Sequence, residues 1–283
     1  MNLGEYLRRE GVEVIGCSST GGGGIDPRSG LFPDTFSIQR ETDAVVYLAQ
    51  SPYYRVNKTN LEHLWNVNVL SALRAGELSR EANVKRFIYA STGNVYSPQF
   101  SPLSEDSPLR RDDWYVLSKI HAEEILSLFK RDLNITIMRL FGIYGTGQKD
   151  KIIPNIIKTV IQEQEVYVEK NPLNPDDHNG LRVSFCYIDD LVGIIAKLLY
   201  LDGPLVLNIA GEKVISIREV ATSIGSFVGK KVSVKVLDRV REGDLIADIA
   251  LLKEVVCPQF TPLQQGLAKT IEFELQNQQS WIK

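Results

Sequence analysis

The chain has 283 residues, of which 43% are hydrophobic and 24% charged, and its formal net charge is −3. This length and composition predict a large α/β unit or two small domains. The slightly acidic balance argues against nucleic-acid binding, and no apolar run reaches the roughly 18 residues that a membrane-spanning helix needs. The charged N-terminal sequence MNLGEYLRRE argues against a secretory signal, and the three scattered cysteines predict neither disulfides nor a metal site. We therefore expect a cytoplasmic protein without a metal ion.

The first part of the chain predicts a short helix, a strand, a loop and a second strand. A helical pattern over residues 2–10 ends at Gly11 and leads into an expected strand at Val12–Gly16. Residues 19–34, STGGGGIDPRSGLFPD, are rich in turn-forming residues and predict a loop. The apolar run DAVVYLAQ, residues 43–50, is typical of a strand that is buried on both faces.

From this strand onward, helices and strands alternate. The expected elements are a helix at 61–82, a strand at 85–92, a helix at 114–131 and a strand at 135–145. Such alternation of apolar strands with helices predicts a doubly wound parallel sheet. Beyond residue 147, a helix at 152–165, short strands and a polar loop predict a smaller α+β lobe. We expect a sheet domain over 1–148, to which part of 184–212 returns, and a second lobe formed by 149–183 and 213–283.

Two polar side chains share one face of the expected helix at 114–131. Tyr115 and Lys119 are four residues apart, so they lie one turn from each other. A phenol has an unperturbed pKa of about 10 and is a poor base at neutral pH, but a nearby ammonium favours the phenolate. The preceding strand ends in Ser91 and Thr92, at the sheet edge where ligands bind in parallel α/β folds. A hydroxyl, a phenol and an ammonium are therefore expected to meet there, as proton transfer to a substrate oxygen requires.

The Tyr-x-x-x-Lys motif is weak alone and gains specificity from the sequence around it. The strand end YAST precedes Tyr115 by about two dozen residues, and several further stretches follow in order: DAVVYLAQ, NVNVLSALRAGELSREANVKRFIYASTGNVY, RLFGIYGTGQ, YIDDLVGIIAKLL and LNIAGEKVISIREVATSI. In these stretches the chain resembles the extended short-chain dehydrogenase/reductase family, the NAD-dependent sugar epimerases and dehydratases. The resemblance runs from about residue 2 to about residue 270. It implies a Rossmann-like NAD(P)-binding domain, a substrate lobe, and a homodimer formed through the helices near 61–82 and 114–131.

The resemblance also implies roles for the residues around the cofactor. Tyr115 takes the place of the acid/base, and Lys119 that of the lysine that binds the nicotinamide ribose and lowers the tyrosine pKa. Asn68 matches an asparagine that supports the cofactor site, although it could instead be a surface amide. Ala49 and Gln50 are expected to line the adenosine side.

On the substrate side, three residues are implicated by the same resemblance. Thr92 takes the place of the catalytic Ser/Thr, although its hydroxyl could instead cap the end of the strand. Asn94 is expected to contact the substrate. Arg182 stands one residue away from the place of an arginine that holds a diphosphate, and its alternative is a surface arginine.

The beginning of the chain departs from the family pattern, which opens with a strand and the fingerprint T-G-x-x-G-x-x-G. The run TGGGGIDP has Pro27 in the third glycine position, and no helix is expected after it. We therefore align residues 2–10 with the first helix of the family and Val12–Gly16 with its second strand. The first strand and the phosphate loop are then missing. Cys17 to Ser19, at the end of the expected second strand, do not distinguish NAD from NADP.

The preferred interpretation is an NAD-dependent epimerase that acts at C4 of a nucleotide-activated sugar, through transient hydride transfer and a keto intermediate. Dehydratases of the family have Asp-Glu after the catalytic threonine, whereas Gly93 and Asn94 stand here, which argues against 4,6-dehydration. One alternative is an NAD(P)-dependent reductase of a keto sugar or small carbonyl. Another is a catalytically impaired remnant, or a truncated gene product, that acts as a scaffold. The expected partners are the nucleotide-sugar and a second copy of the chain, with neither nucleic acid nor a membrane.

Overall fold

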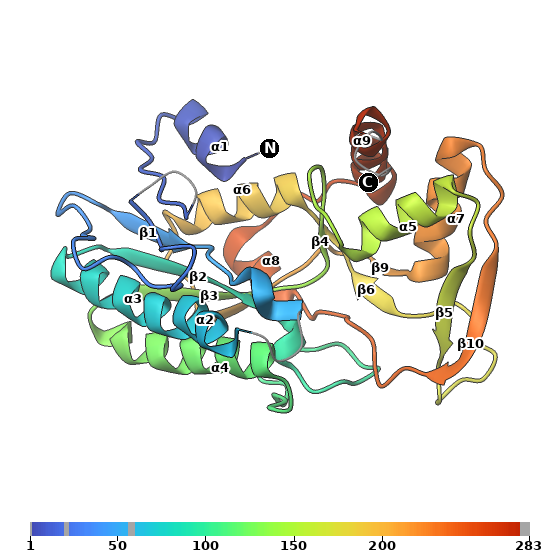
Figure 1. The fold of residues 1–283 in the computed structure, drawn as a ribbon, viewed down its shortest axis with the longest axis horizontal. Helices are drawn as coiled ribbons and strands as arrows, with labels where there is room; N and C mark the ends of the chain where they lie inside the picture. The colour runs from blue at the N-terminus through green and yellow to red at the C-terminus, as the bar shows by residue number, and fades with distance from the viewer. Residues whose placement is uncertain (1, 20–22, 56–59, 278–283) are drawn as a thin grey trace.

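The computed structural model describes residues 2–19, 23–55 and 60–277, and it has a parallel sheet at its centre (Figure 1). Four strands form this sheet in the order β1-β2-β3-β8. They are β1 (Ala44–Tyr47), β2 (Arg86–Thr92), β3 (Asn134–Leu140) and β8 (Val206–Ile209). All neighbours run parallel, and Ala44 pairs with Arg86, Arg86 with Asn134, and Ile137 with Val206. The carboxyl ends of β1 and β2 therefore open at the same edge.

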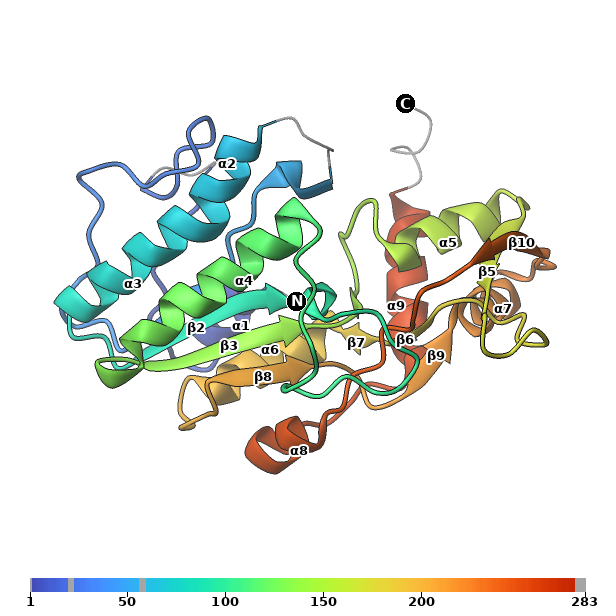
Figure 2. The same ribbon diagram turned by 90° about the horizontal axis from the view of Figure 1, so that it is seen from below.

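Helices cover both faces of the sheet, as Figure 2 shows. One face is covered by α2 (Leu61–Trp65), the π-helical turn η2 (Asn66–Leu70), α3 (Ser71–Glu81), α4 (Trp114–Ser127) and the 3-10 turn η4 (Leu128–Arg131). The other face is covered by α6 (Ile188–Leu198) and α8 (Ala250–Val256). Along β2, Phe87 and Tyr89 join the hydrophobic cluster under α3 and α4, whereas Ile88 joins the cluster under α6 and α8. The expected doubly wound parallel α/β fold is confirmed.

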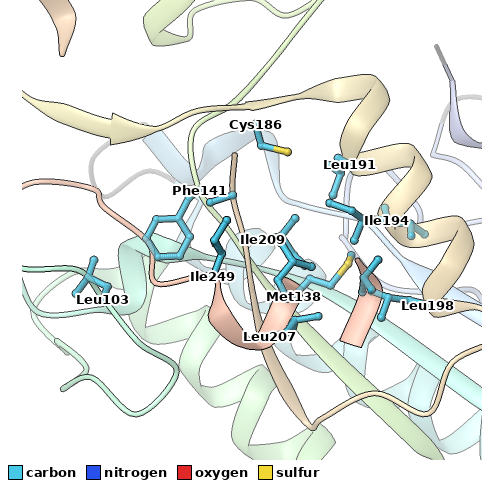
Figure 3. Packing of buried hydrophobic residues seen from close by; sticks show 14 of the residues in the cluster. Leu103, Met138, Phe141, Cys186, Leu191, Ile194, Leu198, Leu207, Ile209 and Ile249 are labelled. Carbon is cyan, nitrogen blue, oxygen red and sulfur yellow. The ribbon is translucent and has the colours of Figure 1, made fainter. Parts of the chain in front are cut away.

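The cluster under α6 and α8 forms a continuous apolar core (Figure 3). Met138 and Leu207, from neighbouring strands, are completely buried there, and Ile194 of α6 is 2% exposed. Phe141, just after β3, is also completely buried. Its ring lies where a side chain at position 93 would point, since a Cβ on Gly93 would come within 2.8 Å of three ring atoms. Close packing thus explains the glycine that follows Thr92 at the end of β2.

A second group of elements packs around a separate hydrophobic cluster. Its helices are α5 (Ile152–Ile161), α7 (Ile217–Val228) and α9 (Leu263–Gln276). Its strand pairs are β5 (Val166–Lys170) with β10 (Val234–Val240), β6 (Arg182–Ser184) with β9 (Val214–Ser216), and β4 (Ile143–Tyr144) with β7 (Cys186–Tyr187). A capping box between Ser216 and Glu219 begins α7, and Gly229 ends it with φ of 69°. The α+β character expected after residue 147 is therefore present.

The N-terminal segment differs from the prediction. Helix α1 (Leu3–Arg9) forms as expected and is capped by Asn2, whose side chain accepts a hydrogen bond from the Gly4 amide at 2.8 Å. The expected strand at Val12–Gly16 is wrong, because these residues have no regular secondary structure. A strand needs a neighbour for its backbone groups, and among the described strands β1 pairs only with β2. Ile15 is accordingly 57% exposed.

The turn-rich loop that precedes β1 lies against the helical layer. Three side chains of this layer contact backbone carbonyl oxygens of the loop. His63 lies 3.3 Å from the carbonyl oxygen of Pro27, Asn66 donates to that of Ser29 at 2.7 Å, and Ser71 donates to that of Gly30 at 2.9 Å. These contacts supply partners for polar side chains that are buried in the helical layer. Two residues of the glycine run, Gly21 and Gly22, lie outside the described residues. None of the described helices is both long enough and apolar enough to cross a bilayer.

Candidate active site

Tyr115 lies in the first turn of α4, close to the carboxyl ends of β1 and β2. Asp113 sets the start of this helix, since its side chain accepts a hydrogen bond from the Val116 amide at 3.0 Å. The half-buried Tyr115 donates its hydroxyl to Oε1 of Gln50 at 3.1 Å. Ala49, which is half-buried, and Gln50 follow β1 after one intervening residue, Leu48. Gln50, which the resemblance assigned to the adenosine side, thus lies beside the candidate acid/base.

Lys119, one turn further along α4, is a buried ammonium that is 1% exposed. Its Nζ donates to the carbonyl oxygen of Ala90 at 2.9 Å and lies 4.8 Å from the centre of the Tyr89 ring. Burial lowers the pKa of Lys119 to about 7, because it disfavours the charged form, although the carboxylate of Glu123 acts in the opposite direction. The lysine is therefore held rigidly between α4 and β2.

Thr92 ends β2 and is 8% exposed. Its Oγ1 accepts a hydrogen bond from the Asn94 amide at 3.2 Å, which caps the 3-10 turn η3 (Gly93–Val95). The cap that the sequence left open as an alternative role is therefore present. It does not exclude a catalytic role, because a hydroxyl that accepts one hydrogen bond still has a proton to donate. The Asn94 side chain is exposed next to this turn.

Asn68 is completely buried, so it is not a surface amide. It lies in the π-helical turn η2, where its Oδ1 accepts from the Ser51 amide at 3.3 Å and its Nδ2 donates to Oγ of Ser118 at 2.9 Å. Ser118 in turn donates to the Tyr115 carbonyl at 2.7 Å. Asn68 thus ties the segment after β1 to the turn of α4 that carries Tyr115. The role in the cofactor site that the resemblance implies for Asn68 stays a prediction.

A buried ion pair below the site was missed by sequence reasoning. Glu123 of α4 and Arg139 of β3 are each 5% exposed, and NH2 of Arg139 lies 2.7 Å from Oε2 of Glu123. Glu123 also accepts a hydrogen bond from Ser91, while Arg139 donates to the Tyr96 hydroxyl at 2.9 Å. A sequence signal existed, since Arg139 interrupts the apolar strand ITIMRL and Glu123 lies one turn beyond Lys119. The network joins the end of β2 to α4 and β3.

A second missed contact comes from the other group of elements. Tyr54, in the 3-10 turn η1 (Pro52–Arg55), has its ring centre 5.2 Å from that of Tyr115. Lys151, directly before α5, donates to the Tyr54 hydroxyl at 2.6 Å. No local sequence signal joins two residues that are 97 positions apart.

Arg182 lies on β6, in a charged cluster away from the residues described so far. Its Nε is 3.2 Å from Oδ2 of Asp244, without hydrogen-bond geometry, and its NH2 is 3.7 Å from Asp177. Arg241, 4% exposed, pairs with the same two carboxylates. Burial raises the pKa of Asp177, but hydrogen bonds led by that from Arg241 outweigh it and hold the pKa at about 2. No described contact joins Arg182 to Tyr115, yet 42% of its side chain remains exposed.

The described residues fit one end of an NAD molecule better than the other. The hydroxyl of Thr92 at the end of β2, and the phenol of Tyr115 and the ammonium of Lys119 on α4, are groups of the kind that a nicotinamide ribose and a reacting alcohol would contact. Within residues 2–19, 23–55 and 60–277, no strand is described before β1, so the strand and glycine turn that open the family pattern are not among the described elements. The same residues contain no group of three or more His, Cys, Asp or Glu side chains that could hold a metal ion.

Known proteins are similar to most of the chain. The profile of the NAD dependent epimerase/dehydratase family matches residues 2–210. A protein of Bacillus subtilis (strain 168) named as an uncharacterized UDP-glucose epimerase, YtcB, is 27% identical over 253 residues, which cover 86% of this chain and 78% of that protein. A UDP-glucuronate 4-epimerase of Thermodesulfobacterium geofontis (strain OPF15) is 28% identical over 260 residues, which cover 86% and 75% of the two chains.

Among solved structures, MoeE5 in complex with UDP-glucuronic acid and NAD superposes with a TM-score of 0.76. The superposition covers 97% of this chain and 95% of that one, at 24% identity. At that identity the likeness concerns the fold, and it extends over both groups of elements.

Proposed function

The chain belongs to the NAD dependent epimerase/dehydratase family, and we propose that it inverts C4 of a nucleotide-activated sugar. The observation that carries this proposal is the position of Tyr115, half-buried one helical turn before a fully buried lysine, on the helix α4 that packs against β2, the strand that Thr92 ends. The two relatives reported above, named as a UDP-glucose epimerase and a UDP-glucuronate 4-epimerase, support the reaction type. NAD, the cofactor in the family's description, is the cofactor that we assign.

The side chains of the site suit proton transfer at a sugar hydroxyl. Tyr115 removes the proton from the hydroxyl on C4 and returns it when the sugar presents its opposite face. Lys119 lies one helical turn away, and its ammonium favours the phenolate that this step needs. Thr92 donates its remaining proton to the same sugar oxygen. Bound NAD would accept and return a hydride at C4. We assign Lys119 to its nicotinamide ribose and, because Gln50 contacts Tyr115, we assign Gln50 to the same end of the cofactor in place of the adenosine side.

The second group of elements forms the substrate lobe in this proposal. We assign it to residues 149–183 and 213–283, with part of 184–212 returning to the sheet domain 1–148, and α8 packing on the sheet. We assign Arg182 to the diphosphate, since 42% of its side chain is exposed although Asp244 and Asp177 lie beside its guanidinium. Asn94, exposed beside Thr92, contacts the sugar.

We also propose that the protein is a homodimer. The helical layer formed by α2, η2, α3, α4 and η4 exposes Leu70 and Leu128, whose exposed fractions are 43% and 77%. Burial of these side chains against a second copy would remove apolar surface from water. A cytoplasmic location accords with the free thiols of Cys17, Cys186 and Cys257.

Replacement of the candidate base tests the reaction. Tyr115→Phe should lower the turnover of UDP-glucose or UDP-glucuronate by about 100-fold or more, because general acid–base catalysis contributes about that much. Tyr200→Phe makes the same chemical change at a tyrosine that is 69% exposed and should leave turnover unchanged. Product formation followed by NMR separates the two epimers directly. Full activity of Tyr115→Phe would refute the assignment.

A calorimetric titration with NAD separates this proposal from the scaffold alternative. The alternative is motivated by the described residues, among which no strand with a glycine turn after it is found before β1. A protein that neither binds NAD nor converts either sugar nucleotide would be better described as a scaffold.

A further inference from the structure

A lysine from the second group of elements reaches toward the candidate base. Lys151 is half-buried and immediately precedes α5. Its Nζ donates to the Tyr54 hydroxyl at 2.6 Å and lies 4.8 Å from the centre of the Tyr54 ring. The Tyr54 ring in turn packs against that of Tyr115, with centres 5.2 Å apart. A positive charge and a second phenol therefore border the place where the C4 hydroxyl must lie.

This ammonium has a hydroxyl as its partner and no described carboxylate. Many other lysines of the described chain pair with acids, as Lys170 does with Asp238 at 2.6 Å and Lys253 with Glu212 at 2.6 Å. Lys151 has no such pair among the described residues, and the first turn of α5 contains no acidic residue. One of its three donors is used by Tyr54, which leaves two for a ligand. The Tyr54 hydroxyl, which accepts this hydrogen bond, holds the ammonium in place.

We propose that Lys151 and Tyr54 form a subsite for a carboxylate on C6 of the sugar, so that the substrate is a nucleotide-activated hexuronate. The inference rests on the proposed function, because it takes Tyr115 to hold the C4 hydroxyl. C6 is attached to C5, the neighbour of C4, so a C6 carboxylate stays close to the base. The diphosphate is attached at C1, across the sugar ring from C4, and is the more distant anion. Charge-assisted hydrogen bonds from an ammonium to a carboxylate are among the stronger contacts that a protein makes.

Binding measurements on the full chain test the subsite without requiring turnover. UDP-glucuronate, UDP-glucose and UDP are titrated calorimetrically into the wild type, Lys151→Met and Lys158→Met. The wild type should bind UDP-glucuronate at least about 10-fold more tightly than UDP-glucose, and Lys151→Met should weaken only UDP-glucuronate, by about 10- to 100-fold. Lys158→Met removes an exposed charge from α5 and should change none of the three affinities.

Two further variants separate a binding role from a structural one. Lys151→Arg keeps the charge and should retain most of the preference for UDP-glucuronate. Tyr54→Phe keeps the ring against Tyr115 but removes the hydroxyl, and should lower that preference while UDP-glucose binding stays unchanged. The opposite result is that Lys151→Met and Lys151→Arg both lose affinity for all three ligands and both melt at a lower temperature than the wild type. That result would overturn the proposal and show that the contact between Lys151 and Tyr54 is purely structural.

The remaining outcomes distinguish the subsite from the reaction. Equal weakening of UDP-glucuronate, UDP-glucose and UDP by Lys151→Met would place the lysine at the diphosphate and overturn the subsite. C4 epimerisation of UDP-glucose with no preference for UDP-glucuronate would also overturn it, while the proposed function would stand. Selective, Lys151-dependent binding of UDP-glucuronate without epimerisation would support the subsite and count against the proposed function.

Discussion

Removal of the buried ammonium of Lys119 should make the protein more stable, by an amount that depends on pH. Burial lowers the lysine pKa from 10.5 to about 7, a difference of about 3.5 units, and each unit corresponds to about 1.4 kcal/mol. The charged form therefore costs the folded state about 5 kcal/mol. Methionine at this position has a similar length and no charge, so Lys119→Met removes this cost. Loss of the hydrogen bond to the Ala90 carbonyl subtracts about 1 kcal/mol at every pH.

The sign of the pH dependence follows from proton binding in the two states. Between pH 7 and 10.5, the unfolded chain holds a proton on Lys119 that the folded protein has lost. The free energy of unfolding of the wild type therefore rises with pH in this window relative to that of the variant. The advantage of Lys119→Met should be about 5 kcal/mol at pH 6 and should fall to about 2 kcal/mol at pH 9, before the constant loss is subtracted.

Urea unfolding of the wild type and Lys119→Met at pH 6, 7, 8 and 9 measures this difference. Lys158→Met, at an exposed position on α5, serves as the control and should show a difference that does not change with pH. A stability difference between wild type and Lys119→Met that stayed constant over these pH values would show that the folded lysine keeps its ordinary pKa, and the argument from burial would be refuted.

Three further variants probe the surroundings of the site. Glu123→Gln leaves the buried Arg139 without its carboxylate and should lower the free energy of unfolding in urea by about 3–5 kcal/mol. The control Glu124→Gln, at an exposed pair with Arg111, should lower it by less than about 1 kcal/mol. Similar values for the two variants would contradict the buried ion pair. Gly93→Ala places a methyl group against the Phe141 ring and should destabilise the protein by about 1–3 kcal/mol. Gly193→Ala, in an open position on α6, should stabilise it by about 0.5–1 kcal/mol. A melting temperature that is higher for Gly93→Ala than for Gly193→Ala would refute the packing argument. Leu128→Lys should shift the protein from dimer to monomer in sedimentation experiments, and a wild type that is already monomeric would dismiss the dimer.

The features that the sequence could predict depend on local periodicity. The helix with Tyr115 and Lys119 was expected at 114–131 and is formed by α4 and η4, because its apolar positions recur at helical spacing. The strand at 85–92 was expected for its continuous apolar run and appears as β2. Their order along the chain also predicted that Thr92 would end a strand next to α4. These relations involve near neighbours, so a linear pattern is enough to express them.

The features that could not be predicted depend on partners elsewhere in the fold. Val12–Gly16 has the alternation of a strand, but whether a strand forms is decided by an adjacent edge, and none is described beside it. The helix expected at 152–165 ends at Ile161, and Glu163 then takes a positive φ of 56°. Lys151 meets Tyr54 only because two groups of elements are folded against each other. A pattern read along the chain contains no information about such contacts.

The π-helical turn η2 sets the rotational phase between the two halves of the long helix. Four consecutive residues of this turn, Asn66 to Val69, are buried. In a regular α-helix, with about 100° per residue, four consecutive side chains would point around most of the circumference of the helix. The wider turn holds one residue more than an α-helical turn, so His63 before it and Asn68 within it both find their partners. Deletion of a single residue here would restore a regular helix and turn one half by about 100° relative to the other. The helix could then keep its hold on the loop at Pro27 or on Ser118 of α4, but not on both.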